Sequence, residues 1–265
     1  MSRVEVRCAD ITLSCVDSGS GHPVVLLHGL AGSAQEMLPI AESLLQRGCR
    51  FIAVDQRGHG FSTRRPRDLS REAYVRDVVA VVEELAAGGP VSLVGQSMGG
   101  HTAMLVAARH PALVRRLVML EAGVGGGDDA ASYPAELGDW FRSWPVPFAN
   151  AAAAAEFLGS APIARSWVRD LEDRPDGLWP RFEPDVMQAA ITAVAERSRW
   201  EEWQAVEAPT MLVRGGNGTL PAAEVRQMLA LRPDVRHVVI PDAGHDVHLE
   251  QHDASVQVLL EFLDC

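Results

Sequence analysis

Short apolar runs and longer amphipathic stretches alternate along most of this chain. Runs rich in Val, Ile and Leu predict eight strands, near residues 4–8, 11–16, 24–28, 50–55, 91–95, 115–120, 210–214 and 237–240. Apolar side chains recur at helical spacing over residues 34–46, 71–86 and 256–263. We expect the first two strands to pair as a hairpin at one edge. The alternation predicts an α/β fold, in which helices cover a mainly parallel sheet.

The alternation breaks between about residues 130 and 203, a segment that holds all six tryptophans of the chain. We therefore predict a core of residues 1–122 and 204–265 and a helical lid of residues 123–203. Glycines at 123–127 indicate a flexible exit toward this lid, and the alanines within residues 149–156 predict a helix.

Tryptophan has a large, rigid, apolar face that suits the wall of a substrate cavity. We expect four tryptophans of the predicted lid to contact a small hydrophobic substrate, namely Trp140, Trp144, Trp167 and Trp179. The alternative is that these side chains only pack the lid against the core.

Ser97 lies where the strand near residues 91–95 gives way to helix-forming residues 101–110. A serine hydroxyl becomes a nucleophile when a sharp turn exposes it beside a base and near backbone N–H groups. Gly95 and Gly99 allow the strand and the helix to approach each other closely at such a turn. This strand-turn-helix setting predicts Ser97 as the nucleophile.

A general base and an oxyanion site are expected at the ends of two other strands. His245 follows the strand near residues 237–240, where its imidazole can take the proton of the serine. The glycine-rich turn that begins at His28 follows the strand near residues 24–28. We expect the N–H groups of Leu30 and Met98 to hold the oxyanion.

Four motifs make this chain resemble the α/β-hydrolase fold family. They are HG at His28–Gly29, DxRGxGxS from Asp55 to Ser62, GxSMGG from Gly95 to Gly100, and GH at Gly244–His245 with a trailing Glu250. The resemblance implies an eight-stranded, mostly parallel sheet with an inserted lid. It also implies an ester-cleaving or related enzyme that works without a cofactor, through an acyl-enzyme and a nucleophile-acid-histidine order.

The acid departs from the family pattern. Most family members carry it in the loop after the seventh strand of the sheet, but here that loop, residues 215–221, contains no carboxylate. We predict that Glu121, at the end of the strand near residues 115–120, takes its place, as in certain similar dehalogenases and lactonases. Asn217 as a neutral orienting group and Asp242 beside the histidine loop are the alternatives. Glu121 would then only cap a turn or pair with an arginine.

The predicted activity is serine-dependent hydrolysis of a carboxylic ester, lactone or thioester of a hydrophobic or aromatic small molecule. Carbon–carbon bond hydrolysis and cofactor-free perhydrolysis stay open, because the resemblance covers both. A non-catalytic ligand receptor on the same scaffold is a third alternative. Dehalogenase and epoxide-hydrolase chemistry is disfavoured, since both use an aspartate nucleophile where this chain has Ser97.

The composition of the chain excludes several kinds of catalytic mechanism and disfavours several kinds of binding partner. All 24 basic residues are arginine, which excludes Schiff-base, Ser-Lys and P-loop mechanisms that need a lysine. The net charge of −11 disfavours nucleic acids and anionic membranes as partners. The start of the chain lacks the features of a secretory signal, so we expect a cytoplasmic protein. The sequence does not decide between a monomer and a homodimer.

Three histidines near the end of the chain have a spacing that can mimic metal ligands, His245, His248 and His252. No arrangement of acidic neighbours there demands a metal, and His245 already has a role as the base. We therefore expect neither a metal nor an organic cofactor.

Overall fold

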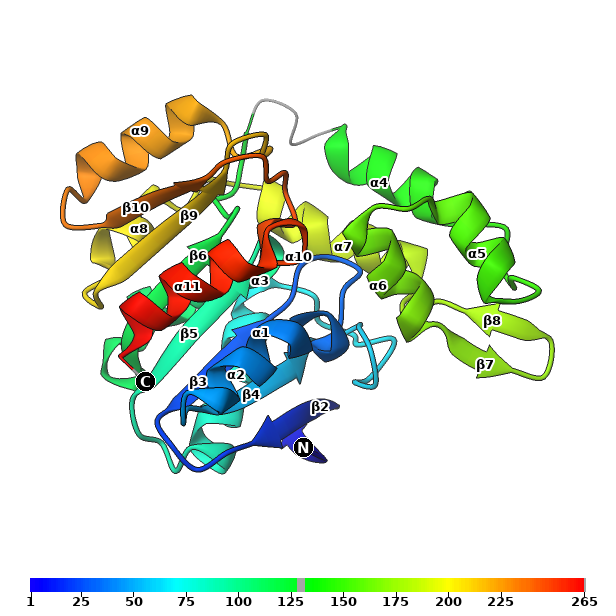
Figure 1. The fold of residues 1–265 in the computed structure, drawn as a ribbon, viewed down its shortest axis with the longest axis horizontal. Coiled ribbons are helices and arrows are strands. Elements are labelled where there is room, and N and C mark those ends of the chain that lie inside the picture. The colour runs from blue at the N-terminus through cyan, green and yellow to red at the C-terminus, as the bar shows by residue number, and fades with distance from the viewer. Residues whose placement is uncertain (128–131, 265) are drawn as a thin grey trace.

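The computed structural model describes residues 1–127 and 132–264 and contains one eight-stranded sheet (Figure 1). The strand order across it is β1-β2-β4-β3-β5-β6-β9-β10. The bounds are β1 (Ser2–Cys8), β2 (Ile11–Ser18), β3 (Pro23–Leu27), β4 (Arg50–Asp55), β5 (Val91–Gln96), β6 (Val114–Leu120), β9 (Thr210–Gly215) and β10 (Arg236–Ile240). β2 pairs antiparallel with β1 and β4, and the other neighbours pair in parallel. The eight predicted strands and the edge hairpin are confirmed.

Helices cover both faces of this sheet (Figure 1). One face carries α1 (Ala34–Gln46) and α11 (His252–Leu263), and the other carries α2 (Arg71–Leu85), α3 (Met98–Arg109), α8 (Trp200–Ala205) and α9 (Ala222–Leu231). The short helices η1 (Pro111–Leu113) and α10 (Val247–Glu250) connect elements of the core. The three helices predicted from apolar spacing are confirmed, and the last begins four residues earlier than expected.

The buried strands supply apolar side chains to both faces, which is why they read as continuous apolar runs. In β3, Val24 and Leu26 pack with α1 and α11, whereas Val25 and Leu27 pack with α2 and α3. Two helices on these faces have side-chain caps, because Ser33 accepts the N–H of Gln35 and Ser70 accepts that of Ala73.

Between β6 and β9 the chain leaves the sheet and forms a separate helical part, at the right of Figure 1. We call residues 133–195 the insertion. Its elements are α4 (Tyr133–Arg142), α5 (Ala151–Leu158), α6 (Pro162–Asp170), the antiparallel strands β7 (Glu172–Arg174) and β8 (Gly177–Trp179), and α7 (Pro184–Ala195). The predicted alanine-rich helix is confirmed as α5, whereas the β7–β8 hairpin was not expected. The role of the insertion as a lid stays a prediction.

The insertion has an aromatic core of its own. Phe141, Trp144, Phe148 and Phe182 are buried together there. Trp203 lies instead in α8 on the sheet, where its indole N–H donates to the Met228 carbonyl at 2.9 Å. The packing therefore groups α8 with the core, although the sequence placed Trp203 at the end of the predicted lid.

An arginine of the core holds the insertion. The Arg64 guanidinium, in the loop after β4, lies 2.6 Å from Glu183 and 3.1 Å from Glu172. Within residues 1–127 and 132–264, no helix is long and apolar enough to cross a membrane.

Candidate active site

Ser97 occupies a sharp turn between β5 and α3, with φ +48° and ψ −117°. A non-glycine residue in this region costs about 1–3 kcal/mol, so its surroundings must hold it there. The Ser97 N–H donates to the Leu120 carbonyl at 2.9 Å. A Cβ at Gly95 would lie 2.4 Å from the Gly99 backbone, and one at Gly99 would lie 2.3 Å from the Leu27 carbonyl oxygen. The two glycines therefore permit the turn in the way that the motif predicts.

The turn after β3 passes beside this serine. A Cβ added at Gly29 would lie 3.5 Å from the Ser97 Cβ. The side chains of Leu30 and Met98 pack in one apolar cluster with Tyr74. In the part of the chain that the structure describes, neither the Leu30 N–H nor the Met98 N–H donates to a backbone carbonyl outside a helix. This placement suits the predicted oxyanion donors, whose role stays a prediction.

The DxRGxGxS turn after β4 supports the turn after β3 through hydrogen bonds. The backbone N–H of Gln56 donates to His28 Nε2 at 3.0 Å, and the Gln56 side-chain amide donates to the His28 carbonyl at 2.7 Å. The buried carboxylate of Asp55 accepts the N–H of Ala34 at 2.7 Å, at the start of α1. The DxRGxGxS residues therefore hold the loops around the serine without lining its cavity.

His245, in the loop after β10, lies beside the predicted acid. Its Nδ1 is 3.5 Å from Glu121 Oε2, and the Glu121 side chain is fully buried. The Thr219 hydroxyl is closer, with Oγ1 at 2.8 Å from the same nitrogen. Among the described residues, Glu121 is the one acidic residue with a carboxylate oxygen within 4.0 Å of a ring nitrogen of His245. The structure thus brings the predicted acid and base together, with Thr219 as an additional neighbour.

The loop after β9 wraps around the Glu121 carboxylate. One oxygen accepts the N–H of Gly215 at 2.7 Å, and the other accepts those of Thr219 at 2.9 Å and Leu220 at 3.1 Å. A Cβ at Gly218 would lie 2.1 Å from Glu121 Oε1, so a glycine is required there. The loop that lacks a carboxylate of its own therefore binds one supplied by the neighbouring strand.

The negative charge of Glu121 and the positive charge of a protonated His245 stabilise each other. Burial raises the pKa of Glu121, but the interaction with His245 and the N–H donors outweigh it, so this pKa is lowered. Burial lowers the pKa of His245, but Glu121 and the charge of Asp246 outweigh it, so this pKa is raised. Glu121 is therefore ionised at neutral pH and stabilises a protonated imidazole, which is the task of the acid in a triad.

The two alternatives to Glu121, the neutral Asn217 and the acidic Asp242, are exposed. Asn217 is exposed, and its backbone N–H donates to the Ala243 carbonyl at 2.8 Å. Asp242 is exposed where the chain leaves β10. A residue that the sequence did not single out, Gln96, ties β5 to the loop of His245, because its amide donates to the His245 carbonyl at 3.1 Å.

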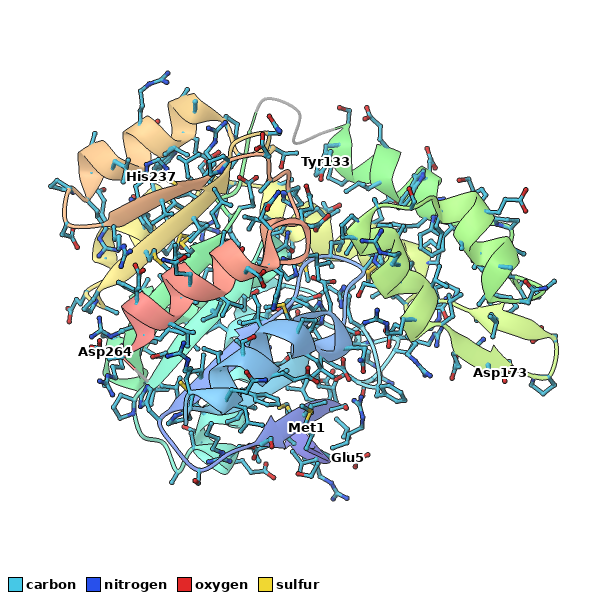
Figure 2. The ribbon with its side chains drawn as sticks, in the orientation of Figure 1. Met1, Glu5, Tyr133, Asp173, His237 and Asp264 are labelled. Carbon is cyan, nitrogen blue, oxygen red and sulfur yellow. The ribbon has the colours of Figure 1, made fainter. Side chains whose placement is uncertain are left out.

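Ser97, Met98, Glu121 and His245 line one cavity of about 810 Å³. Apolar walls come from α7 and from two aromatic residues, while polar side chains lie toward α3 and α9. These other lining side chains include Tyr133, Ile191, Val194, Trp200, His101, Ser198, Glu224 and Gln227. No arginine is found among the described lining residues. Figure 2 shows Tyr133 at the end of the insertion nearest the core, with Asp173 at its far end.

The four tryptophans predicted to bind substrate are not among the residues that line this cavity. Trp144 and Trp167 pack together in the insertion, with ring centroids 5.5 Å apart, and Trp140 packs against both. The Trp179 indole N–H donates to Asp176. Their contact with substrate stays a prediction. Among the described residues that line the cavity, Trp200 is the one tryptophan.

Comparison with known proteins identifies the family of this chain. The chain is 28% identical to sn-1-specific diacylglycerol lipase ABHD11 of Mus musculus, over 98% of this chain and 87% of the lipase. It is also 28% identical to 2-(acetamidomethylene)succinate hydrolase of Mesorhizobium japonicum, over 96% and 92% of the two chains. A crystal structure of E-2-(acetamidomethylene)succinate hydrolase matches with a TM-score of 0.90 and 25% identity, covering 100% of this chain and 99% of that one. Residues 22–251 match the family model of the alpha/beta hydrolase fold. The chain therefore belongs to the α/β-hydrolase family and is a hydrolase of the esterase type.

Proposed function

We propose that this protein is a serine hydrolase that cleaves an uncharged, largely apolar carboxylic ester, or a thioester or lactone of the same character, through an acyl-enzyme. The observation that carries this proposal is the meeting of Ser97, His245 and Glu121 at one cavity beside the Met98 backbone. These three side chains keep the nucleophile-acid-histidine order along the chain.

Each group has one task in the proposed mechanism. Ser97 Oγ attacks the substrate carbonyl carbon while His245 takes its proton, and Glu121 stabilises the imidazolium that forms. The N–H groups of Leu30 and Met98 hold the negative oxygen of the tetrahedral intermediate. His245 then gives the proton to the leaving alcohol or thiol. A water molecule attacks the acyl-enzyme in the same way and releases the acid and Ser97.

The charge of the cavity supports an uncharged substrate. Glu121 and Glu224 both line it, and no described arginine faces them. A carboxylate group of a substrate would be repelled in this space and would lack a cationic partner. We therefore do not extend the succinate substrate of one relative to this chain, whereas the ester substrate of the lipase agrees with an uncharged cavity.

Hydrolysis of p-nitrophenyl butanoate tests the proposal. We expect the purified protein to release nitrophenol and Ser97→Ala to fall to the background rate, because the hydroxyl that forms the acyl-enzyme is gone. The matched control is Ser143→Ala, an exposed serine of the insertion, which should keep the parent rate. A fluorophosphonate probe should modify Ser97 in the parent, as read by mass spectrometry.

Equal rates in the parent and Ser97→Ala, with no modification of Ser97, would contradict the proposal. Binding of an ester to both proteins without turnover would then favour the ligand receptor.

A further inference from the structure

His101 lies one helical turn after Ser97 on α3 and lines the same cavity. Its side chain takes no part in the proposed mechanism. The residue is only 2% exposed, and within the described chain neither ring nitrogen has a hydrogen-bond partner. A buried polar group left without a partner costs about 1–3 kcal/mol. Native structures hold few such groups, so each one needs an explanation.

The imidazole of His101 is held in its neutral form. Burial is the main cause that lowers its pKa well below the usual range, and the charges of Arg71 and Arg199 lower it further. The Val124 carbonyl opposes this shift, but it accepts the Arg199 N–H at 2.8 Å, and no ring nitrogen of His101 reaches it with hydrogen-bonding geometry. A neutral imidazole presents one N–H donor and one lone pair.

Two other polar residues of the same cavity, Ser198 and Glu224, lie with His101 along the glycine-rich segment 123–127. A Cβ at Gly125 would lie 2.9 Å from His101 Nε2, and one at Gly126 would lie 2.3 Å from the Ser198 hydroxyl oxygen. A Cβ at Gly123 would lie 2.1 Å from Glu224 Oε1. These glycines, expected to form a flexible exit, therefore leave room for polar side chains at the cavity.

Glu224 adds an acceptor to this part of the cavity. Its Oε1 accepts the Val124 N–H at 2.8 Å, and burial raises its pKa. An anionic group here would meet this carboxyl, while a purely apolar group would leave His101 without a partner. A hydroxyl suits the site better, because it can donate to one group and accept from another.

We propose that His101, Ser198 and Glu224 form a polar subsite that binds an uncharged hydroxyl group of the substrate. We call these three residues the His101 subsite. The proposal rests on the proposed function, and it places the hydroxyl beside the first turn of α3, on the side of the cavity that His101 lines. The natural substrate is then a hydroxylated ester rather than a simple alkyl ester.

Two pairs of esters test the subsite. Propyl butanoate and 2,3-dihydroxypropyl butanoate differ by hydroxyls on the alcohol, and methyl hexanoate and methyl 6-hydroxyhexanoate differ by one on the acyl chain. We expect the ratio of kcat/KM, hydroxylated over plain, to fall about tenfold in His101→Phe for at least one pair. This change equals about 1.4 kcal/mol, which lies within the cost of a lost neutral hydrogen bond.

Two further variants serve as controls. His101→Gln keeps a donor and an acceptor and should restore part of the ratio. His237→Phe makes the same replacement on β10, away from Tyr133 and the insertion (Figure 2), and should keep the parent ratio.

Measuring ligand binding by Ser97→Ala proteins tests the subsite without any turnover. By calorimetry, Ser97→Ala should bind the hydroxylated member of that pair about tenfold more tightly than Ser97→Ala/His101→Phe does. Ratios that stay the same in the parent, His101→Phe and His101→Gln for both pairs would overturn the subsite and leave the hydrolase intact. If the parent hydrolyses none of the four esters, equal binding by the two Ser97→Ala proteins would overturn the subsite. The proposed function fails if p-nitrophenyl butanoate is not hydrolysed either.

Discussion

At the scale of single residues, the proposed role of Glu121 as the acid is the most testable assignment. Three backbone N–H groups donate to the Glu121 carboxylate, so Glu121→Gln would turn an amide NH2 toward donors as well as remove the charge. We expect kcat/KM for p-nitrophenyl butanoate to fall about 10³- to 10⁴-fold, as when the acid of other triads becomes an amide. Asp242→Asn, at an exposed position, should stay within about twofold. Equal losses in the two variants would refute this assignment.

The proposed mechanism also predicts how Glu121 affects the pH dependence of the reaction. His245 must be neutral to act as a base, and Glu121 contributes to raising its pKa above the usual 6.5. The rate should therefore rise with pH through a midpoint above 6.5. Loss of the Glu121 charge favours the neutral imidazole, so in Glu121→Gln we expect this midpoint to move to lower pH. The pH profile of kcat/KM measures it, and a midpoint that moves upward would contradict the pairing.

Residues within short motifs could be singled out from the sequence, and so could Glu121, whereas two other neighbours of the His245 loop could not. Ser97 and His245 follow apolar strands in recognisable turns, so local sequence identifies them. Thr219 reaches His245, and Gln96 reaches the same loop across 149 positions. Only the register of the folded sheet creates these contacts. The glycines of the loop after β9 were the available signal, because Gly218 leaves the space that Glu121 fills.

At the scale of elements, the loop after β9 holds an acid supplied by β6. Gly218→Ala should displace the carboxylate, because the new Cβ would lie 2.1 Å from Oε1. A shift of this kind in a catalytic group can cost about a hundredfold in rate, which is our expectation for kcat. The matched control is Gly216→Ala, where the nearest atoms lie 3.4 Å from the added Cβ. Thermal unfolding of both variants checks their folding. Equal activity in the two would contradict the conclusion that the loop after β9 positions the Glu121 carboxylate.

Elements with a strong pattern were predictable, and short ones were not. The eight strands of the sheet and the helices α1, α2 and α11 follow from apolar periodicity. β7 and β8 have three residues each, and β7 reads Glu-Asp-Arg, so no alternation of apolar residues marks them. Their pairing depends on neighbours in the insertion, such as Phe148, which exchanges backbone hydrogen bonds with Leu178.

At the scale of the whole molecule, the cavity belongs to the core and the insertion together. The core supplies Ser97 and His245, while α7 of the insertion supplies Ile191 and Val194. The ion pairs of Arg64 with Glu172 and Glu183 join the two parts. The preference for a given acyl chain length should therefore depend on the position of α7, because side chains of α7 form the apolar wall of the cavity.

A pair of substitutions distinguishes this arrangement from the contacts expected from sequence. Ile191→Phe adds volume at the cavity wall, so we expect kcat/KM for p-nitrophenyl decanoate to fall about tenfold relative to the butanoate. Trp140→Ala removes a ring that packs on Trp144 and Trp167. It should lower the free energy of unfolding by about 1–3 kcal/mol and leave the chain-length preference unchanged. If Trp140→Ala changes the preference and Ile191→Phe does not, the tryptophans contact substrate after all, and the insertion must then move during the reaction.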